Sequence, residues 1–273
     1  MNRILSTAGT EFRISLRNRW VAIAMGLMAV FSLVLSLAGS APTGGLGVDR
    51  LSVTVASLTS LSVYLIPLLA LLMSFDAIAG EAERGTLPLL LAYPIAREEV
   101  LLGKLMAHLG ILAVAVLLGH GLAAGVAIWA DQGSLAGLPA LWRLSWSSVL
   151  LGATFLGAGY ALSALSRRPS GAAGLAIGLW LGLVVLYDLA LLSAIVADNG
   201  GWFTTEAFPV ALLVNPADAF RLFNLTASGA AAAAAGVGGA ADAIPLWQSL
   251  ASVVLWPMAA LALAAAAFRK VTP

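Results

Sequence analysis

The sequence predicts an all-α membrane protein with six transmembrane helices, built as a single transmembrane domain over residues 1–273. Apolar residues make up 61% of the chain and charged residues only 10%, a composition that suits lipid rather than water as the surrounding solvent. A spanning helix needs roughly 20 mostly apolar residues, and several uncharged stretches reach that length. There is no cysteine, which excludes disulfides, iron–sulfur clusters and thiolate metal sites.

The first expected element is a short helix over residues 1–19, which is basic and interrupted by apolar residues such as Phe12 and Ile14. This pattern favours an interfacial helix on the membrane surface, with a simple basic flank as the alternative. Uncharged apolar stretches then mark six spans, near residues 20–38, 51–75, 100–130, 142–166, 171–197 and 246–268. The third and fifth exceed the minimum length, so they should tilt, kink or project beyond the bilayer.

The connections between spans differ in length and charge. Residues 39–50 and 131–141 are short and rich in Gly and Pro, whereas 198–245 is long and contains an alanine- and glycine-rich run, 228–243, expected to be a spacer. Eleven basic residues flank one set of segments and three flank the other. Because cytoplasmic segments retain Lys and Arg, the sequence predicts cytoplasmic termini, a cytoplasmic 76–99 loop and a periplasmic 198–245 loop. The net charge of +1 gives no sign of a nucleic-acid partner.

The loop 76–99 concentrates charge in a chain that is otherwise almost uncharged. Two helical pieces are predicted, one near 77–92 and one after Pro94, whose missing amide suits a helix start. Leucines stand between the charges, which indicates an amphipathic element that rests on another protein or on the membrane. An ordinary solvated loop with alternating charge is the alternative.

The residues of this loop resemble the cytoplasmic loop of type-2 ABC exporter permeases, a family with type V architecture. The matching residues are Glu81-Ala82-Glu83-Arg84-Gly85-Thr86-Leu87, Leu89-Leu90-Leu91, Tyr93-Pro94-Ile95, Arg97 and Gly103-Lys104. The resemblance implies that the loop is a coupling helix region seated in a cleft of an ATP-binding subunit. Pro88 departs from the family pattern and is expected to shorten the helix.

The resemblance also implies roles and partners. Glu81, Glu83 and Arg84 are expected to make polar contacts with the ATPase, Thr86 and Leu87 to serve as cap and anchor, and Gly85 and Arg97 to complete the coupling set. The chain has no G-x-x-x-x-G-K-[ST] phosphate loop. It is therefore expected to be no enzyme itself and to bind no cofactor, with ATP and Mg²⁺ on the partner ATPase.

Within that family, the sequence is most similar to permeases that serve maturation of nitrous oxide reductase, and the similarity includes segment 215–221. This implies a homodimer in the bacterial inner membrane, two copies of the ATPase, and a periplasmic partner for copper-site assembly, such as a copper-handling repeat protein. The residues expected to contact that partner are Trp202, Phe203, Asn215, Asp218 and Arg221.

Three polar residues lie inside expected spans. Asp188 costs at least a few kcal/mol in hydrocarbon unless it is paired or wet; it is either a proton or cation site or, as we favour, a hydrogen-bond partner of Tyr160, a serine or a second copy. His108 and His120 suggest copper, yet twelve residues along one helix place the imidazoles about 18 Å apart. Packing roles are therefore favoured and no metal site is expected.

Small residues mark expected helix contacts, because Gly174, Gly178 and Gly182 form one stripe along the fifth span. Two other functions remain as alternatives: an ion-coupled secondary transporter that uses Asp188, and a type-2 ABC exporter of another cargo. An intramembrane protease is disfavoured, because Ser170 has no histidine at matching depth.

Overall fold

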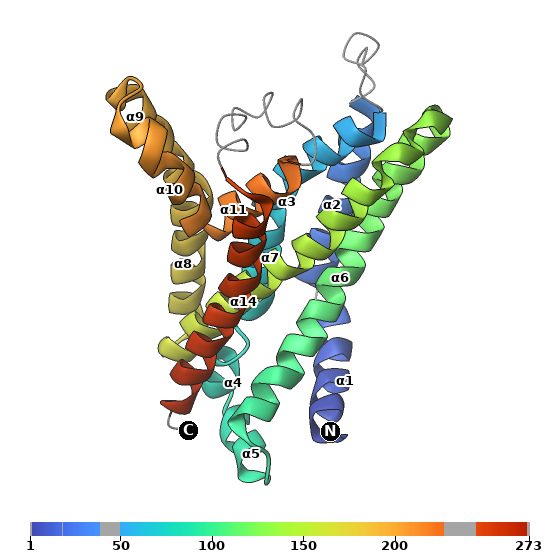
Figure 1. Cartoon of the computed structure of the whole chain (residues 1–273). Coiled ribbons are helices and arrows are strands. Elements are labelled where there is room, and N and C mark those ends of the chain that lie inside the picture. The colour runs from blue at the N-terminus through green and yellow to red at the C-terminus, as the bar shows by residue number, and fades with distance from the viewer. Residues whose placement is uncertain (1, 18, 39–49, 227–243, 272–273) are drawn as a thin grey trace.

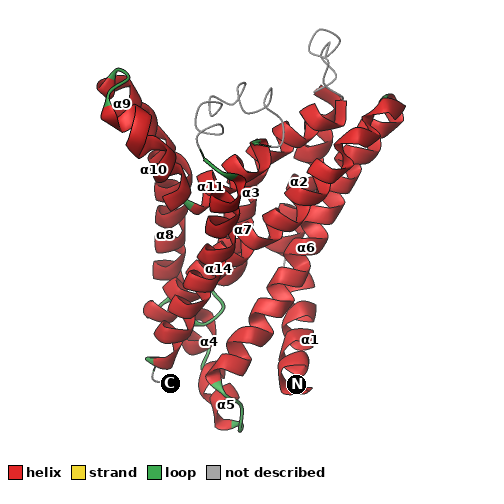
Figure 2. Cartoon of the chain, viewed as in Figure 1, coloured by secondary structure: helices red, strands yellow, loops and turns green. Residues whose placement is uncertain are grey.

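The computed structural model describes residues 2–17, 19–38, 50–226 and 244–271, and within these ranges all the regular structure is helical (Figure 2). The predicted all-α class is confirmed. The expected spacer at 228–243 and all but the last residue of the expected turn at 39–50 lie outside the described residues.

The helices follow the apolar stretches of the sequence. In chain order they are α1 (Asn2–Leu16), α2 (Arg19–Ala38), α3 (Arg50–Ser74), α4 (Ala79–Glu83), α5 (Thr86–Ala92), α6 (Arg97–Ala130), η2 (Gln132–Gly137), α7 (Leu138–Leu165), α8 (Pro169–Trp180), η3 (Leu181–Leu186), α9 (Tyr187–Asp198), η4 (Phe203–Ala207), α10 (Phe208–Val214), α11 (Pro216–Leu225) and α14 (Leu246–Arg269). Of these, η2 is a 3₁₀ helix, whereas η3 and η4 are π-helical.

Five segments are long and apolar enough to cross a membrane, and α1 with α2, bent by 71°, makes a sixth if the pair counts as one span. The five are Arg50–Glu83, Arg97–Ala130, Leu135–Leu165, Pro169–Asp198 and Leu246–Arg269. Helix α1 is not isolated on a surface, because it packs along α6. The expected helix over residues 1–19 is present, but its buried side faces protein.

The centre of the bundle is formed by α7, which packs against both α14 and α3. Glycines on α7 permit these close approaches. A Cβ on Gly157 would lie 2.9 Å from the carbonyl carbon of Ala260 on α14, and one on Gly159 would lie 1.9 Å from the Ser74 hydroxyl on α3. Backbones this close allow dense packing in the apolar solvent, where helix association depends on van der Waals contact.

The bundle has two distinct ends (Figure 1). One end carries α4, α5 and both ends of the chain, and we call it the termini end; the α9–α10 hairpin stands at the other, which we call the hairpin end. The termini and the 76–99 loop therefore lie on the same side of the bundle, in agreement with the charge pattern.

The segment after the fifth span returns into the bundle. The chain reverses at Asn199 and Gly200, which have φ values of 48° and 84°, and η4 with α10 runs back beside α9. Asn215 then caps α11 by accepting a hydrogen bond from the Ala217 amide at 2.9 Å, followed by Pro216 in the first turn. Helix α11 is buried against α14, α3 and α7.

This arrangement differs from the expectation that the segment 198–245 is a periplasmic loop whose polar residues contact a partner. Within this segment, α11 packs inside its own chain instead. The cause is local: an N-cap residue followed by Pro216 starts an amphipathic helix, and its polar side finds partners such as Ser147, whose hydroxyl accepts from the Asn224 amide at 3.0 Å.

Candidate functional site

In the charged loop at the termini end, the piece expected as one helix near 77–92 folds as two short helices, α4 and α5. Gly85 has a φ of 70°, a left-handed conformation that suits glycine and separates α4 from α5. The Thr86 hydroxyl donates to the Glu81 carbonyl at 3.2 Å. The break therefore occurs at Gly85, three residues before Pro88, which lies inside α5.

The start of α4 is attached to the end of α7. The backbone amides of Ile78 and Ala79 both donate to the Ser163 hydroxyl, at 3.0 and 2.9 Å. Arg84 at the end of α4 pairs with Asp76 at 3.3 Å on the exposed side. These contacts fix the loop against the bundle, because the amides at a helix start have no partner within the helix itself.

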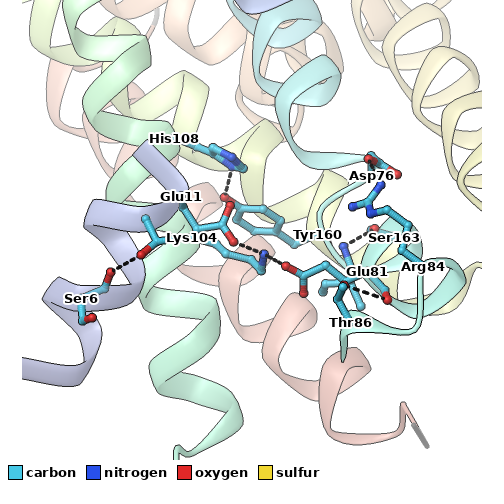
Figure 3. A network of polar contacts seen from close by, with 12 residues as sticks. Ser6, Glu11, Asp76, Glu81, Arg84, Thr86, Lys104, His108, Tyr160 and Ser163 are labelled. Carbon is cyan, nitrogen blue, oxygen red and sulfur yellow. Dashed lines mark hydrogen bonds and ion pairs between the residues drawn. The ribbon is translucent and has the colours of Figure 1, made fainter. Parts of the chain in front are cut away.

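A buried lysine joins three helices at this end (Figure 3). The Lys104 side chain on α6 is only 2% exposed, and its ammonium contacts Glu11 on α1 and Glu81 on α4, the latter at 2.6 Å. Helix α1 approaches α6 closely here, since a Cβ on Gly103 would lie 2.7 Å from the Thr7 Cβ. The Glu11–Lys104–Glu81 triad thus ties the coupling loop to the N-terminal helix.

The triad borders a cavity of about 610 Å³ between α1, the end of α3, α4 and α6. His108 also lines it, one turn from Lys104, and its Nδ1 lies 2.7 Å from the Tyr160 hydroxyl. Tyr160 is therefore a partner of His108 and not of Asp188, contrary to expectation. His120, deeper in the bundle, bonds Ser62 at 3.3 Å and Ser145 at 3.2 Å.

These contacts give both histidines partners within the bundle. The side chains of the described residues include no group of three or more His, Asp or Glu that could hold a metal ion. His108 and His120 thus sit as hydrogen-bonded packing residues between helices.

Arg97, expected to contact the ATPase, binds the end of α14. Its Nη1 donates to the carbonyls of Phe268, Arg269 and Val271, at 2.7, 3.0 and 2.7 Å, and its guanidinium carbon lies 5.8 Å from the centroid of the Phe268 ring. A cation that binds the last carbonyls of a helix satisfies groups without an internal partner and complements the helix dipole. Arg97 therefore connects the coupling loop to the last span.

We expect Arg97→Ala to destabilise the end of α14 by about 1.5–3 kcal/mol, the usual range for a hydrogen bond to a charged group. The amides of Lys270 and Val271, which bond Ala267 and Phe268, should exchange with deuterium faster. Arg269→Ala is the matched control, because its pair with Glu98 is 67% and 45% exposed and such surface pairs contribute little. Equal exchange in the two variants would contradict the capping role.

Four exposed residues of the loop, Glu83, Arg84, Leu89 and Tyr93, are together called the coupling tip. Leu89 is 67% and Tyr93 66% exposed, an unusual position for large apolar side chains outside a membrane span. Glu81 and Leu87, expected to contact the ATPase, point inward instead, and Leu87 is fully buried. Leu89 and Tyr93 belong to the matched loop, but the expected ATPase contacts included Leu87 and not these two. Leu87 and Leu89, two positions apart, face opposite sides of a helix.

At the hairpin end, Asp188 has a basic partner. Arg221 on α11 pairs with Asp188 on α9 at 2.9 Å and with Asp218 at 3.0 Å. Asp188 was expected to bond Tyr160, a serine or a second copy, whereas α11 enters the bundle and brings Arg221 to it. Asn215, the residue before α11, also contacts η3, because its side-chain amide donates to the Leu183 carbonyl at 2.6 Å.

This packing also corrects part of the predicted periplasmic contact set. The side chains of Asn215 and Asp218 are buried within the chain, and Arg221 is mostly buried. Trp202 is 71% exposed and Phe203 partly exposed, at the turn into the hairpin. Trp202 is thus the predicted contact residue that presents a large surface at this end.

The glycine stripe of the fifth span faces open space within the single chain. A Cβ added at Gly174, Gly178 or Gly182 would meet no atom within 4 Å. The stripe that the sequence marks for close helix packing therefore has no partner helix among the described residues of this chain.

Comparison with known proteins agrees with this architecture. A model of the ABC-2 family of transporter proteins matches residues 5–271. The chain is 44% identical to the probable ABC transporter permease protein NosY of Pseudomonas aeruginosa, over 98% of both chains. It is 41% identical to the protein of the same name from Stutzerimonas stutzeri, over 99% of both. The chain therefore belongs to the ABC-2 family of transporter permeases.

Proposed function

We propose that this permease couples ATP hydrolysis by a separate subunit, through the coupling tip, to an event at the hairpin end. Membership of the family implies an ATPase partner. The coupling tip supports this docking place, because Leu89 and Tyr93 are exposed on the same loop as the charged residues Glu83 and Arg84. Contacts of this loop and of Arg97, which follows it, join this region to α1, α6, α7 and α14. Apolar side chains rimmed by charges are typical of protein contact surfaces.

The proposed orientation places the termini end in the cytoplasm of a bacterial inner membrane. The loops and helix ends there carry most of the basic side chains, among them Arg13, Arg17, Arg84, Arg97, Arg167, Arg168, Arg269 and Lys270. Positive residues near span ends are retained on the cytoplasmic side. An ATPase that binds the coupling tip would then meet ATP where it is made.

We propose a homodimer that closes along the fifth span. The support is the stripe of Gly174, Gly178 and Gly182, which faces open space in one chain, on a helix whose side chains are mostly exposed. Small residues let two helices approach closely in lipid. Gly178→Cys should form a disulfide between two copies under oxidation, whereas Leu117→Cys on the exposed side of α6 should not.

For the event at the hairpin end we propose copper-site maturation of nitrous oxide reductase. The support is the similarity, at more than 40% identity over nearly the whole chain, to two proteins named NosY. Trp202, exposed at this end, would contact a periplasmic partner that handles copper.

Co-purification tests the proposal directly. The tagged permease, expressed with the ATPases and periplasmic proteins of its own organism, should retain one kind of ATPase subunit and stimulate its ATP hydrolysis. A chain that purifies alone in mild detergent and moves a solute on a proton gradient in liposomes would contradict the proposal. Retention of an ATPase from a polysaccharide or drug exporter would contradict only the copper assignment.

A further inference from the structure

Two carboxylates share one guanidinium where the fifth span meets α11. Arg221 Nη2 lies 2.9 Å from Asp188 Oδ2, and Arg221 Nη1 lies 3.0 Å from Asp218 Oδ1. The Asp218 side chain is 1% exposed, whereas that of Asp188 is 28% exposed. Arg221 thus bridges a buried acid on α11 and a partly accessible acid on α9.

The charges of this cluster do not balance. Two ionised carboxylates and one guanidinium leave a net charge of about −1 in a site with low dielectric, where uncompensated charge is costly. The second Asp218 oxygen, Oδ2, is also buried without a hydrogen-bond partner. Protonation of one carboxylate would remove the excess charge, because the neutral acid costs less to bury than the ionised one.

Among the described residues, Arg221 is the only cation that forms an ion pair with either carboxylate. The titratable groups that act on the cluster are Tyr187 on α9 and Tyr64 on α3. Arg143 on α7 lies over the Phe223 ring, 5.7 Å from its centroid. Helix α10 has no titratable residue, and the only one in α14 is Arg269 at its far end.

We propose that Asp188 and Asp218 hold one proton between them at neutral pH, so that the cluster is a proton-binding site at the hairpin end. Asp218 is the main carrier, because it is the more deeply buried acid and its Oδ2 is free to take the proton. In agreement, burial and the neighbouring Asp188 carboxylate raise the pKa of Asp218 to about 8 against the opposing effect of Arg221. Asp188, with 28% of its side chain exposed, is the more accessible of the two acids.

Proton occupancy decides how Arg221 is shared. With the proton on Asp218, the Arg221 guanidinium forms an ion pair with the Asp188 carboxylate on the fifth span, and the cluster is neutral. Loss of the proton makes Asp218 compete for the same guanidinium. The strength of the link between α9 and α11 therefore depends on pH, independently of the proposed coupling to an ATPase.

Infrared difference spectroscopy of the full chain in lipid nanodiscs tests this site, because a protonated carboxylic acid has a carbonyl stretch separate from those of carboxylates and amides. Between about pH 6 and pH 10, the buried acid band of the wild type should disappear. Asp218→Asn should lose this band already at the lower pH. Asp188→Asn should lose it too, since one carboxylate beside Arg221 is balanced without a proton.

Glu206→Gln, which removes an exposed acid of the same hairpin, is the matched control and should keep the band. Both Asn variants are expected to lose the band, so either one is sufficient for the test if the other does not fold. A wild type without a titrating acid band, or a band of unchanged strength in both Asn variants, would overturn the proposal.

Thermal unfolding offers a second readout with a definite sign. The folded cluster binds a proton that an unfolded aspartate, with its ordinary pKa, releases near pH 4. The folded state thus binds more protons between about pH 4 and pH 8, and stability falls as pH rises through that window. The unfolding temperature of Asp218→Asn should fall less over this range than that of the wild type. Parallel pH profiles would contradict the site.

Discussion

Lys104→Met is expected to destabilise the fold by about 3–5 kcal/mol. Lys104 is 2% exposed, and it compensates the mostly buried carboxylates of Glu11 and Glu81. Removal of the ammonium leaves two like charges close together with no counter-ion. Denaturant unfolding in detergent micelles measures the loss, and proteolysis of the 76–96 loop should become faster because α4 loses its link to α6.

The control for this substitution is Arg84→Met, on the same loop. Its pair with Asp76 is 58% and 41% exposed, so the change should stay below about 1 kcal/mol. The triple variant Glu11→Gln, Glu81→Gln and Lys104→Met removes every charge of the triad and should recover most of the lost stability. A stable Lys104→Met protein with an unchanged loop would show that the triad does not hold the coupling loop.

Leu89→Asp is expected to weaken ATPase binding by about 2 kcal/mol or more, a roughly 30-fold loss, as for a central apolar residue of an interface. Leu89 is 67% exposed in the single chain, so the substitution should leave its stability unchanged. The measurement is permease-stimulated ATP hydrolysis as the permease concentration is varied. A higher half-saturating concentration with the same maximal rate would show that docking, and not chemistry, is affected.

Trp202→Asp is the matched control at the hairpin end, because Trp202 is 71% exposed, about as much as Leu89. It should leave the stimulation of ATP hydrolysis unchanged. If both substitutions lower stimulation equally, the effect comes from general damage to the fold, and the coupling tip loses its special role.

Composition and short-range pattern predict a large part of this fold. Long apolar runs mark α2, α3, α6, α7 and α14, because the solvent demands about 20 apolar residues for each span. The motif 81–87 also marks the one loop where charge is concentrated. Local signals are sufficient at such places, since each depends on residues that are neighbours in sequence.

The sequence predicts less where distant segments meet. Arg97 caps α14 across 171 to 174 residues of chain, and Lys104 pairs with Glu11 across 93. Asp188 was assigned no basic partner, because Arg221 was placed in an outer loop, whereas the Asn215 cap and Pro216 start a helix that enters the bundle. Long-range ion pairs follow from packing and leave no periodic trace in the sequence.

Site-specific photo-crosslinking tests the central claim most directly. A photoreactive residue at position 89, and separately at position 202, is activated in intact cells that express the full transporter. The account predicts that position 89 captures an ATPase subunit and position 202 does not. Capture of the ATPase at position 202 with none at position 89 would contradict both the docking surface and the orientation of the protein in the membrane.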